Sequence, residues 1–231
     1  MCPELEHINV TVTLPMITPP PLVALCQLRH LSTELGNEPN IWSTLSDLLT
    51  SVSAPRLEML DLRLSQVAFS TLSFGTQPTS TLVFPAGRLD SVTNLTVKIM
   101  DMQGRSQNDY NAIVYLFCAC INIQQVEWTN IELLKFLKAL KRRGAERKLP
   151  SPQRLLLRCN MFYSPFGEPN AIDMAGSVGG IIKCLENIGS QPLQILIIEG
   201  KLGKDGPLFA NSIGGRLLRE SDSKRAVIQL G

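Results

Sequence analysis

Histidine, long apolar runs and strong net charge are scarce or missing in this chain of 231 residues, and each absence excludes a class of protein. Only two histidines are present and none of the six cysteines stands in a CxxC pair, so we expect no metal site. No apolar run approaches the roughly 20 residues that cross a bilayer, so we expect no membrane contact. A formal net charge of +2 gives no field that would indicate a nucleic acid partner.

The first residues and the cysteines together suggest a compartment. The N-terminus has no basic region followed by an apolar run, so we expect no secretory signal peptide. We therefore expect the cysteines to be reduced thiols in a cytoplasmic or nuclear protein. A composition with 44% apolar and 18% charged residues is typical of a folded domain with a core of normal size.

One short phrase recurs along the chain. The segments "CPELEHINV" (2–10) and "APRLEMLDL" (54–62) both carry apolar residues in their fourth, seventh and ninth slots. Seven copies can be aligned, with fourth slots 23 to 41 residues apart and about 31 on average. The fourth-slot residues are Leu5, Leu28, Leu57, Val92, Ile123, Pro152 and Leu193.

The spacing of the slots predicts a strand in each copy. Residues two apart in an extended strand share a face, so slots 7 and 9 form one face and slots 6, 8 and 10 form the other. The interval between copies leaves room for a return segment, so neighbouring strands can be parallel. The seventh and ninth slots hold Ile8 and Val10, Leu31 and Thr33, Leu60 and Leu62, Leu95 and Val97, Val126 and Trp128, Leu155 and Leu157, and Leu196 and Ile198.

Several return segments have the periodicity of helices. We predict helices over 40–52, from Asp109 over 109–121, over 130–144 and over 179–189. The third should begin at Asn130, bury Leu134 and stop near Gly144, and "GSVGG" (176–180) should be a turn before the fourth. Prolines exclude a helix from 11–24, and 65–88 is predicted to be irregular.

These phrases resemble the C-terminal repeats of F-box/leucine-rich-repeat proteins, in the degenerate form abundant in fungi, over residues 2–200. The general pattern LxxLxLxxN is approached best at Pro152, Leu155, Leu157 and Asn160. The resemblance implies a protein-recognition module, linked to ubiquitination through its substrates. Family members carry a helical F-box before the repeats; here Met1 is followed at once by a repeat, so we expect the chain to begin within the repeat array.

The predicted fold is an α/β, irregular leucine-rich-repeat-like right-handed solenoid with about seven parallel strands and helices on the convex side. It should occupy residues 1–200, followed by a C-terminal capping segment or tail at 201–231. A doubly wound Rossmann-like sheet is the alternative, but a sheet covered on both faces needs apolar residues on both. The eighth slot is polar or charged in five of the seven copies, which favours the solenoid: Asn9, Ser32, Asp61, Thr96, Glu127, Leu156 and Ile197.

Motifs for enzymatic chemistry are weak. The segment "LQILIIEGKLGKDG" (193–206) places Gly200, Gly203 and Gly206 after a strand but lacks GxGxxG and GxxxxGK[ST], so we interpret it as a turn. His7 and His30 occupy the sixth slots of neighbouring copies, where they can lie close together, without a catalytic signature beside them. We therefore expect a non-enzyme without a cofactor.

A basic cluster, "KRRGAERK", spans residues 141–148. It can be a targeting signal or a phosphate-binding patch. Cations also interact favourably with the carbonyl groups that end a helix, and this second interpretation is favoured here.

The candidate site is the strand face formed by slots 6, 8 and 10, which is the concave side if the sheet curves. This face carries side chains of both charges and becomes apolar at one end. Such a face suits a protein or peptide partner better than a polyanion. The alternative, that the face is only solvated or that the tail 207–231 covers its apolar end, stays open. The candidate partner-binding residues are Asp61, Arg63, Lys98, Glu127, Arg154, Leu156, Arg158, Ile195, Ile197 and Glu199.

Overall fold

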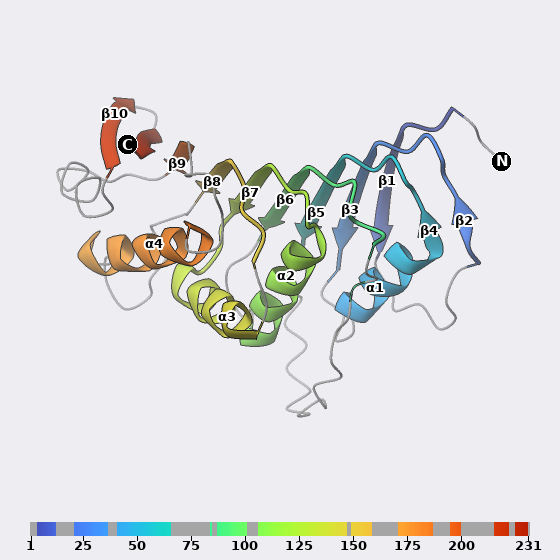
Figure 1. The fold of residues 1–231 in the computed structure, drawn as a ribbon, viewed down its shortest axis with the longest axis horizontal. Helices are drawn as coiled ribbons and strands as arrows, with labels where there is room; N and C mark the ends of the chain where they lie inside the picture. The colour runs from blue at the N-terminus through green and yellow to red at the C-terminus, as the bar shows by residue number, and fades with distance from the viewer. Residues whose placement is uncertain are drawn as a thin grey trace. The chain divides into compact units, whose positions relative to one another are not determined.

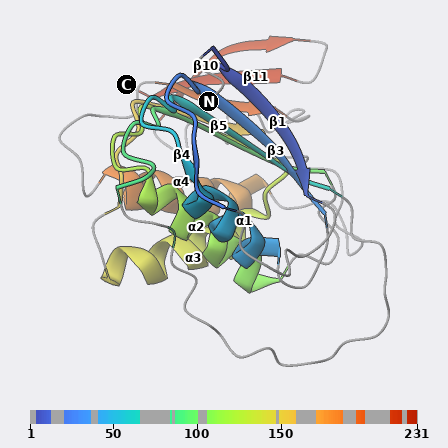
Figure 2. The ribbon, with the colours of Figure 1, turned by 90° about the vertical axis from the view of Figure 1, so that its right-hand side faces the viewer.

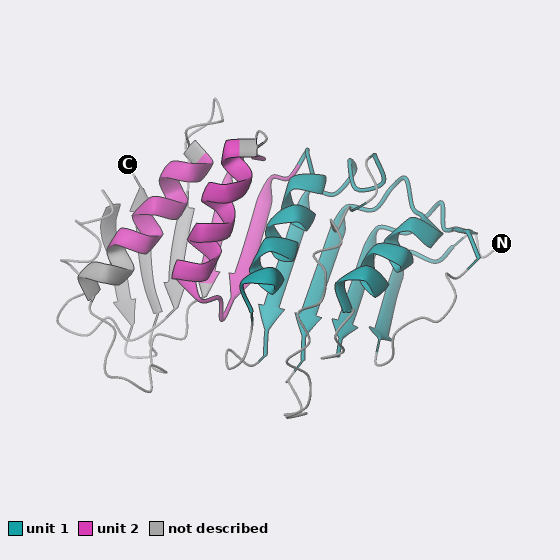
Figure 3. Ribbon diagram, turned by 90° about the horizontal axis from the view of Figure 1, so that it is seen from below, with its two compact units in different colours: residues 1–122 teal, residues 123–231 magenta. Residues whose placement is uncertain are grey.

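The computed structural model is an α/β fold with a mostly parallel sheet and helices (Figure 1). Both a leucine-rich-repeat-like solenoid and a Rossmann-like fold have these features. The chain divides into two compact units, Met1–Asn122 (unit 1) and Ile123–Gly231 (unit 2), coloured separately in Figure 3. The structure describes residues 4–12, 21–36, 41–65, 84, 87–100, 106–146, 149–158, 171–186, 195–199, 215–221 and 225–230.

Unit 1 is built on parallel strands that lie side by side in the order in which they occur along the chain. These are β1 (His7–Val12), β3 (His30–Leu35), β5 (Met59–Leu64) and β6 (Asn94–Ile99). A second, two-stranded parallel sheet pairs β2 (Val23–Ala24) with β4 (Val52–Ser53).

Two helices, α1 (Ile41–Ser51) and α2 (Gln107–Ala119), lie on the same side of the unit 1 sheet (Figure 2). The side chain of Trp42 in α1 joins them, because its Nε1 donates a hydrogen bond to Oδ1 of Asp109 at 2.8 Å. The other side of β1, β3 and β5 carries no helix of unit 1 among the described residues.

The start of α2 differs from the prediction, which began this helix at Asp109. Ser106 is the N-cap instead: its Oγ accepts a hydrogen bond from the Asp109 N–H at 3.3 Å, and its own N–H donates to Asp109 Oδ2 at 2.8 Å. This reciprocal capping box satisfies backbone donors that would otherwise lack partners, which fixes the first turn before Asp109.

Unit 2 contains three parallel strands, β7 (Gln125–Thr129), β8 (Arg154–Arg158) and β9 (Ile195–Glu199). An antiparallel hairpin continues the sheet at β9, formed by β11 (Arg225–Leu230) and β10 (Gly215–Ser221). The helices α3 (Leu133–Glu146) and α4 (Ala171–Glu186) pack against each other on one side of β7, as Figure 3 shows.

Both helices predicted in unit 2 are present, but their predicted starts are wrong. Asn130 has a positive φ of 57° and lies in a bend, so α3 begins at Leu133; it leaves Leu134 exposed, against the prediction, and ends at Glu146, near the predicted Gly144. The segment 176–180 is not a turn either, because it lies inside α4. A tertiary contact accounts for Gly180: a Cβ there would lie 2.8 Å from Cδ2 of Leu137 in α3, so any larger residue would force the Leu137 side chain to move.

The prediction of a strand in each of the seven copies is confirmed. Within each unit the strands pair slot for slot; for example, Ile8 of β1 lies opposite Leu31 of β3, which lies opposite Leu60 of β5. Burial alternates as the spacing predicts. Slots 7 and 9 of β3, β5, β6, β7 and β8 are buried, whereas slots 6 and 8 of the same strands are exposed or half-buried.

Two further slots, which the sequence template did not include, also belong to the core. Slot 1 is buried in every described copy, and in the first three of these copies the N–H of slot 4 donates to its carbonyl group, closing the lead-in turn. In unit 1, slot 11 extends the buried face by one residue. The first-slot residues are Leu25, Ala54, Leu89, Cys120 and Leu149, and the eleventh-slot residues are Val12, Leu35, Leu64 and Ile99.

A repeated hydrogen bond sets the register between copies. The slot 5 carbonyl group of one copy accepts from two consecutive N–H groups of the next copy, at 2.8 to 3.0 Å. In unit 1 the acceptors are Glu6, Arg29 and Glu58, and in unit 2 the acceptor is Gln124. Each strand therefore starts at the same height as its neighbour.

Thr33 is the one polar residue in the ninth slot of the seven copies, and its replacement by an apolar residue should stabilise the protein. Its side chain is fully buried, and its Oγ1 has no hydrogen-bond partner among the described residues. Thr33→Val keeps the shape and removes this unpaired group, so we expect the free energy of unfolding in urea to rise by about 1 kcal/mol.

Thr96→Val is the matched control, since Thr96 lies in a strand but on the half-buried eighth slot. It should change the free energy of unfolding by less than about 0.5 kcal/mol. A loss of stability in the Thr33 variant would contradict the assignment of slot 9 to an apolar core.

Cys120 should be the slowest described cysteine to react with an alkylating reagent. Burial raises the pKa of its thiol to about 12, with smaller contributions from Cys118 and Asp90. Only the thiolate reacts, so at pH 8 about one Cys120 thiol in 10⁴ is reactive. Peptide-resolved labelling with iodoacetamide should modify the exposed Cys26 first and Cys120 only on unfolding. Equal rates in the native protein would contradict the burial of slot 1.

Candidate functional site

The uncovered side of the unit 1 sheet is called the open face of unit 1 below. It consists of slots 6, 8 and 10 of four strands, and all of these residues are exposed or half-buried. Figure 2 shows α1 and α2 on the opposite side. The open face of unit 1 comprises His7, Asn9, Thr11, His30, Ser32, Glu34, Met59, Asp61, Arg63, Asn94, Thr96 and Lys98.

A histidine pair lies at one end of this face, as the sequence predicted. The rings of His7 and His30 are 5.5 Å apart and nearly perpendicular. Nε2 of His30 lies 2.9 Å from Oδ2 of Asp61 in the next strand, and both side chains are about one quarter exposed. This contact joins the side chains of two neighbouring strands, and among the described residues no hydroxyl or thiol group hydrogen-bonds to His30.

Two cations are neighbours at the other end of the strands. Arg63 and Lys98 occupy slot 10 of adjacent strands and lie opposite each other in the register, with Glu34 on the far side of Arg63. Neither cation forms an ion pair with any residue in the described ranges. Like charges in neighbouring positions of a sheet repel each other, and this repulsion is relieved when an acidic group binds between them.

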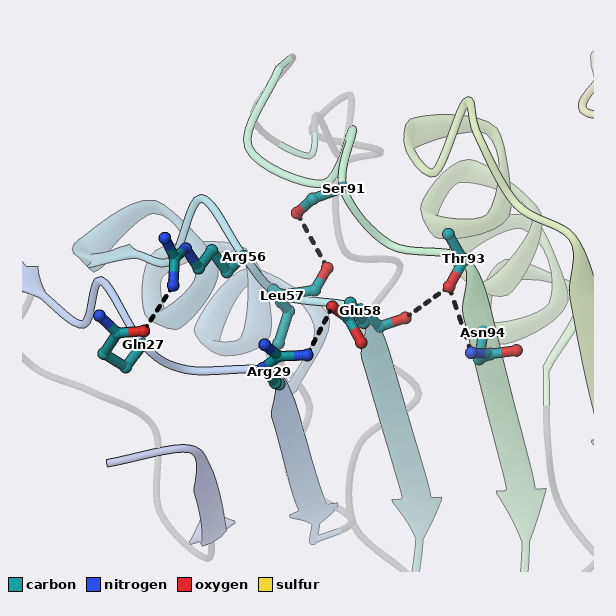
Figure 4. Close-up of polar contacts among 8 residues, drawn as sticks. All are labelled: Gln27, Arg29, Arg56, Leu57, Glu58, Ser91, Thr93 and Asn94. Atoms are coloured by element: carbon teal, nitrogen blue, oxygen red, sulfur yellow. Dashed lines mark hydrogen bonds and ion pairs between the residues drawn. The ribbon is translucent and has the colours of Figure 1, made fainter. Parts of the chain in front are cut away.

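A polar ladder runs along the lead-in turns of unit 1 (Figure 4). Nη1 of Arg29 lies 3.2 Å from Oε1 of Glu58, and the Thr93 hydroxyl group donates to the Glu58 carbonyl group at 3.3 Å. Between the same two turns as Arg29 and Glu58, Arg56 donates to Gln27 Oε1 at 2.7 Å. These residues occupy slots 3 and 5 of successive copies. The sequence template left these slots unassigned, and their contacts keep the turns, and hence the open face, in register.

The candidate residues Asp61, Arg63 and Lys98 therefore lie together, on the two adjacent strands β5 and β6. The remaining candidates belong to unit 2. There the register places Glu127 opposite Leu156, and Leu156 opposite Ile197. Leu156 is half-buried and Glu127 is half-buried, which makes this row accessible at β7 and β8.

The other unit 2 candidates flank this row. Arg154 is exposed and pairs with Ile195, while Arg158 lies opposite Thr129. Glu199 ends β9 and lies opposite Arg225 of β11.

The alternative to a free strand face is that the tail 207–231 covers its apolar end. Its described parts, 215–221 and 225–230, pair along the edge of β9 within the sheet. This pairing sets Val227 opposite Ile197, so the apolar row of Leu156 and Ile197 continues into the hairpin.

Other predicted features have the following positions. Lys141 and Arg142 are exposed and Arg143 is half-buried in the last turns of α3, while 147–148 lie outside the described residues. Gly200, Gly203 and Gly206 also lie outside them. Within the described ranges, no three His, Cys, Asp or Glu residues are grouped so as to hold a metal ion. No helix in that part of the chain is long and apolar enough to cross a membrane.

Comparisons with family models, with curated proteins and with solved structures each found no match to this chain. The resemblance to F-box/leucine-rich-repeat proteins stays a prediction. The basis for proposing a function is therefore the geometry of the open face of unit 1 and of the row of Glu127, Leu156 and Ile197 in unit 2.

The contact between His30 and Asp61 should be measurable as a coupling free energy. We expect a double-mutant cycle of His30→Ala and Asp61→Ala, followed by urea unfolding, to give a coupling of about 0.5 to 1 kcal/mol, because both groups are partly screened by solvent. The coupling should shrink in about 1 M NaCl.

The matched control is the cycle of His7→Ala with Asp61→Ala. His7 contacts the ring of His30 but forms no ion pair with Asp61 among the described residues, so its coupling should be below about 0.3 kcal/mol. Equal couplings in the two cycles would contradict the specific pairing of His30 with Asp61.

Proposed function

We propose that this chain is a non-catalytic protein-recognition module that binds a protein or peptide on its open strand face. The observation that carries the proposal is the open face of unit 1, where twelve side chains stand in register, accessible to a partner and backed by a buried core. We interpret the whole as an irregular leucine-rich-repeat-like right-handed solenoid with helices on the convex side.

The repetition of backbone contacts supports the solenoid. The same slot 5 carbonyl group, the same slot 1 to slot 4 turn and the same buried slots recur from copy to copy. In repeat proteins each unit contacts mainly its neighbours and buries a continuous core with them. A repeat in sequence that is also a repeat in hydrogen bonding is typical of that class.

The order of the strands gives independent support. In unit 1 the order is β1-β3-β5-β6 and in unit 2 the parallel strands follow as β7-β8-β9, so the strands of successive copies are neighbours within each unit. A doubly wound sheet reverses its strand order at the crevice where its ligand binds. Neither set of parallel strands contains such a reversal.

The chemistry of the open face favours a protein partner. In unit 1 the carboxylate group of Asp61 is paired with His30, while Arg63 and Lys98 have no anionic partner within the described residues. In unit 2 the accessible row joins Glu127 to the apolar Leu156. Mixed polar, charged and apolar positions in one face are characteristic of protein interfaces.

The resemblance to F-box/leucine-rich-repeat proteins adds a biological setting to the proposal. In that family such repeats select substrates for ubiquitination, so we propose a substrate of this kind as the partner. The same proposal places the protein in the cytoplasm or nucleus.

Charge reversal on the open face should weaken the binding of peptides selected against the chain. We would select ligands from a displayed random-peptide library on the native protein, then measure their affinity for the double variant Arg63→Glu, Lys98→Glu. Because reversal turns attraction for acidic groups into repulsion, we expect the affinity of the dominant ligands to fall at least about tenfold. Leu156→Asp with Ile197→Asp tests the unit 2 row in the same way.

The matched control is Lys138→Glu with Lys183→Glu, which reverses two exposed cations on the helices and should leave affinities unchanged. If the open-face variants fold and keep every ligand, the strand face is not the binding surface. Equilibrium dialysis against a nucleotide panel tests the Rossmann-like alternative. Saturable binding that is lost on substitution of Gly200 or Gly203 would favour a nucleotide-binding domain instead.

A further inference from the structure

Strand β1 has one free hydrogen-bonding edge among the described strands of unit 1, since it pairs only with β3. The Glu6 carbonyl group accepts from His30 N–H, and the Val12 carbonyl group accepts from Gly36 N–H. In a parallel pair such bonds alternate along the strand, so residues 6, 8, 10 and 12 bond to β3. The N–H and C=O groups of His7, Asn9 and Thr11 therefore point outward from the edge.

The side chains at this edge are less covered than their equivalents in the other copies. Slot 4 is 39% exposed at Leu5, but 0% at Leu28 and 2% at Leu57. Ile8 and Val10 are half-buried, whereas the residues opposite them in β3 are fully buried. Leu22 and Val23, just before the second copy, are also exposed. The end of the sheet thus offers apolar surface beside unpaired backbone groups.

The sequence of β1 has none of the devices that protect an edge strand. "HINVTV" contains no proline, no glycine and no Asp, Glu, Lys or Arg, and four of its six residues are β-branched. Natural proteins protect free edge strands with charged side chains, proline or β-bulges, because an unprotected edge can pair with another strand. An edge of this composition favours pairing.

We propose that a second copy of this chain pairs with the free edge, so that two β1 strands lie antiparallel about a twofold axis at Asn9. The edge uses the backbone groups of His7, Asn9 and Thr11, whereas the open face uses their side chains, so the proposal goes beyond the recognition function. The outward N–H and C=O groups fix the register. With Asn9 opposite the partner's Asn9, His7 lies opposite the partner's Thr11, and all six outward-pointing groups of each strand are bonded.

The same register also matches the two faces of the strand. The polar residues His7, Asn9 and Thr11 meet only one another on the open side, while Ile8 lies beside the partner's Val10 on the covered side. A shift by one residue would set polar against aliphatic positions throughout. No like charges are brought together, because the strand carries no formal charge. β1 is therefore self-complementary, as a twofold interface requires.

Cysteine cross-linking tests the register directly. Asn9→Cys should form an intersubunit disulfide, since opposed residues of a hydrogen-bonded antiparallel pair have Cα atoms about 5.5 Å apart, within the range that a disulfide spans. Thr11→Cys is the matched control: it is equally exposed, but two such residues would lie about 13 Å apart. Both variants would carry Cys2→Ser and Cys26→Ser, and peptide mapping would identify the linked residues.

The expected result is a covalent dimer for Asn9→Cys alone, and a mixed dimer when His7→Cys and Thr11→Cys proteins are combined. Cross-linking of Asn9→Cys and Thr11→Cys to equal extents would overturn the register and with it the proposal. Failure of both to cross-link under oxidising conditions would overturn it as well.

Sedimentation equilibrium on the unmodified chain gives an independent test. We expect a reversible dimer of the 25.5 kDa chain. Asn9→Pro removes only an outward N–H group, a position at which an edge strand accepts proline, and should weaken dimerisation at least about tenfold. Asn9→Lys, a surface substitution that opposes two like charges at the axis, should do the same. A monomer at all concentrations, or a dimer insensitive to both variants, would overturn the proposal.

Discussion

The register between neighbouring strands is the constraint on which the rest of this structure depends. In four copies it is held by the carbonyl group of slot 5, which accepts hydrogen bonds from two N–H groups of the next copy. Because side chains alternate with a period of two, a slip of one residue would carry the whole buried column of a strand to the open side. The lead-in turn and the polar ladder of Arg29, Glu58 and Thr93 oppose such a slip.

Much of this could be predicted from the sequence, because the strand signal is local and repeated. A period of two in Leu60 and Leu62 identifies a covered face wherever it recurs, and seven of the eleven described strands follow from it. The helix ends could not be predicted as well. The glycines of 176–180 predict a turn from sequence. The close approach of Gly180 to Leu137 is a tertiary contact, and such a contact produces no periodic pattern in the sequence. Likewise the capping box makes Ser106 the N-cap of α2, which therefore begins at Gln107 and not at Asp109.

The candidate site was predictable in position and not in chemistry. Slot number alone places Asp61, Arg63 and Lys98 on one face of two adjacent strands. It does not say that Asp61 is already paired with His30, nor that the two cations lack a partner among the described residues, since both depend on side-chain conformation. The open face and the free edge of β1 use different groups. The face presents side chains and the edge presents backbone, so the two proposals do not compete for the same groups.

An engineered pair of cysteines in unit 1 tests the register most directly. Glu34 and Arg63 occupy slot 10 of adjacent strands and lie opposite each other. The double variant Glu34→Cys, Arg63→Cys should therefore form an intrachain disulfide in the folded protein, whereas Ser32→Cys, Arg63→Cys, displaced by two residues on the same face, should not. Preferential bridging of the displaced pair would contradict the alignment of the strands and the open face built on it.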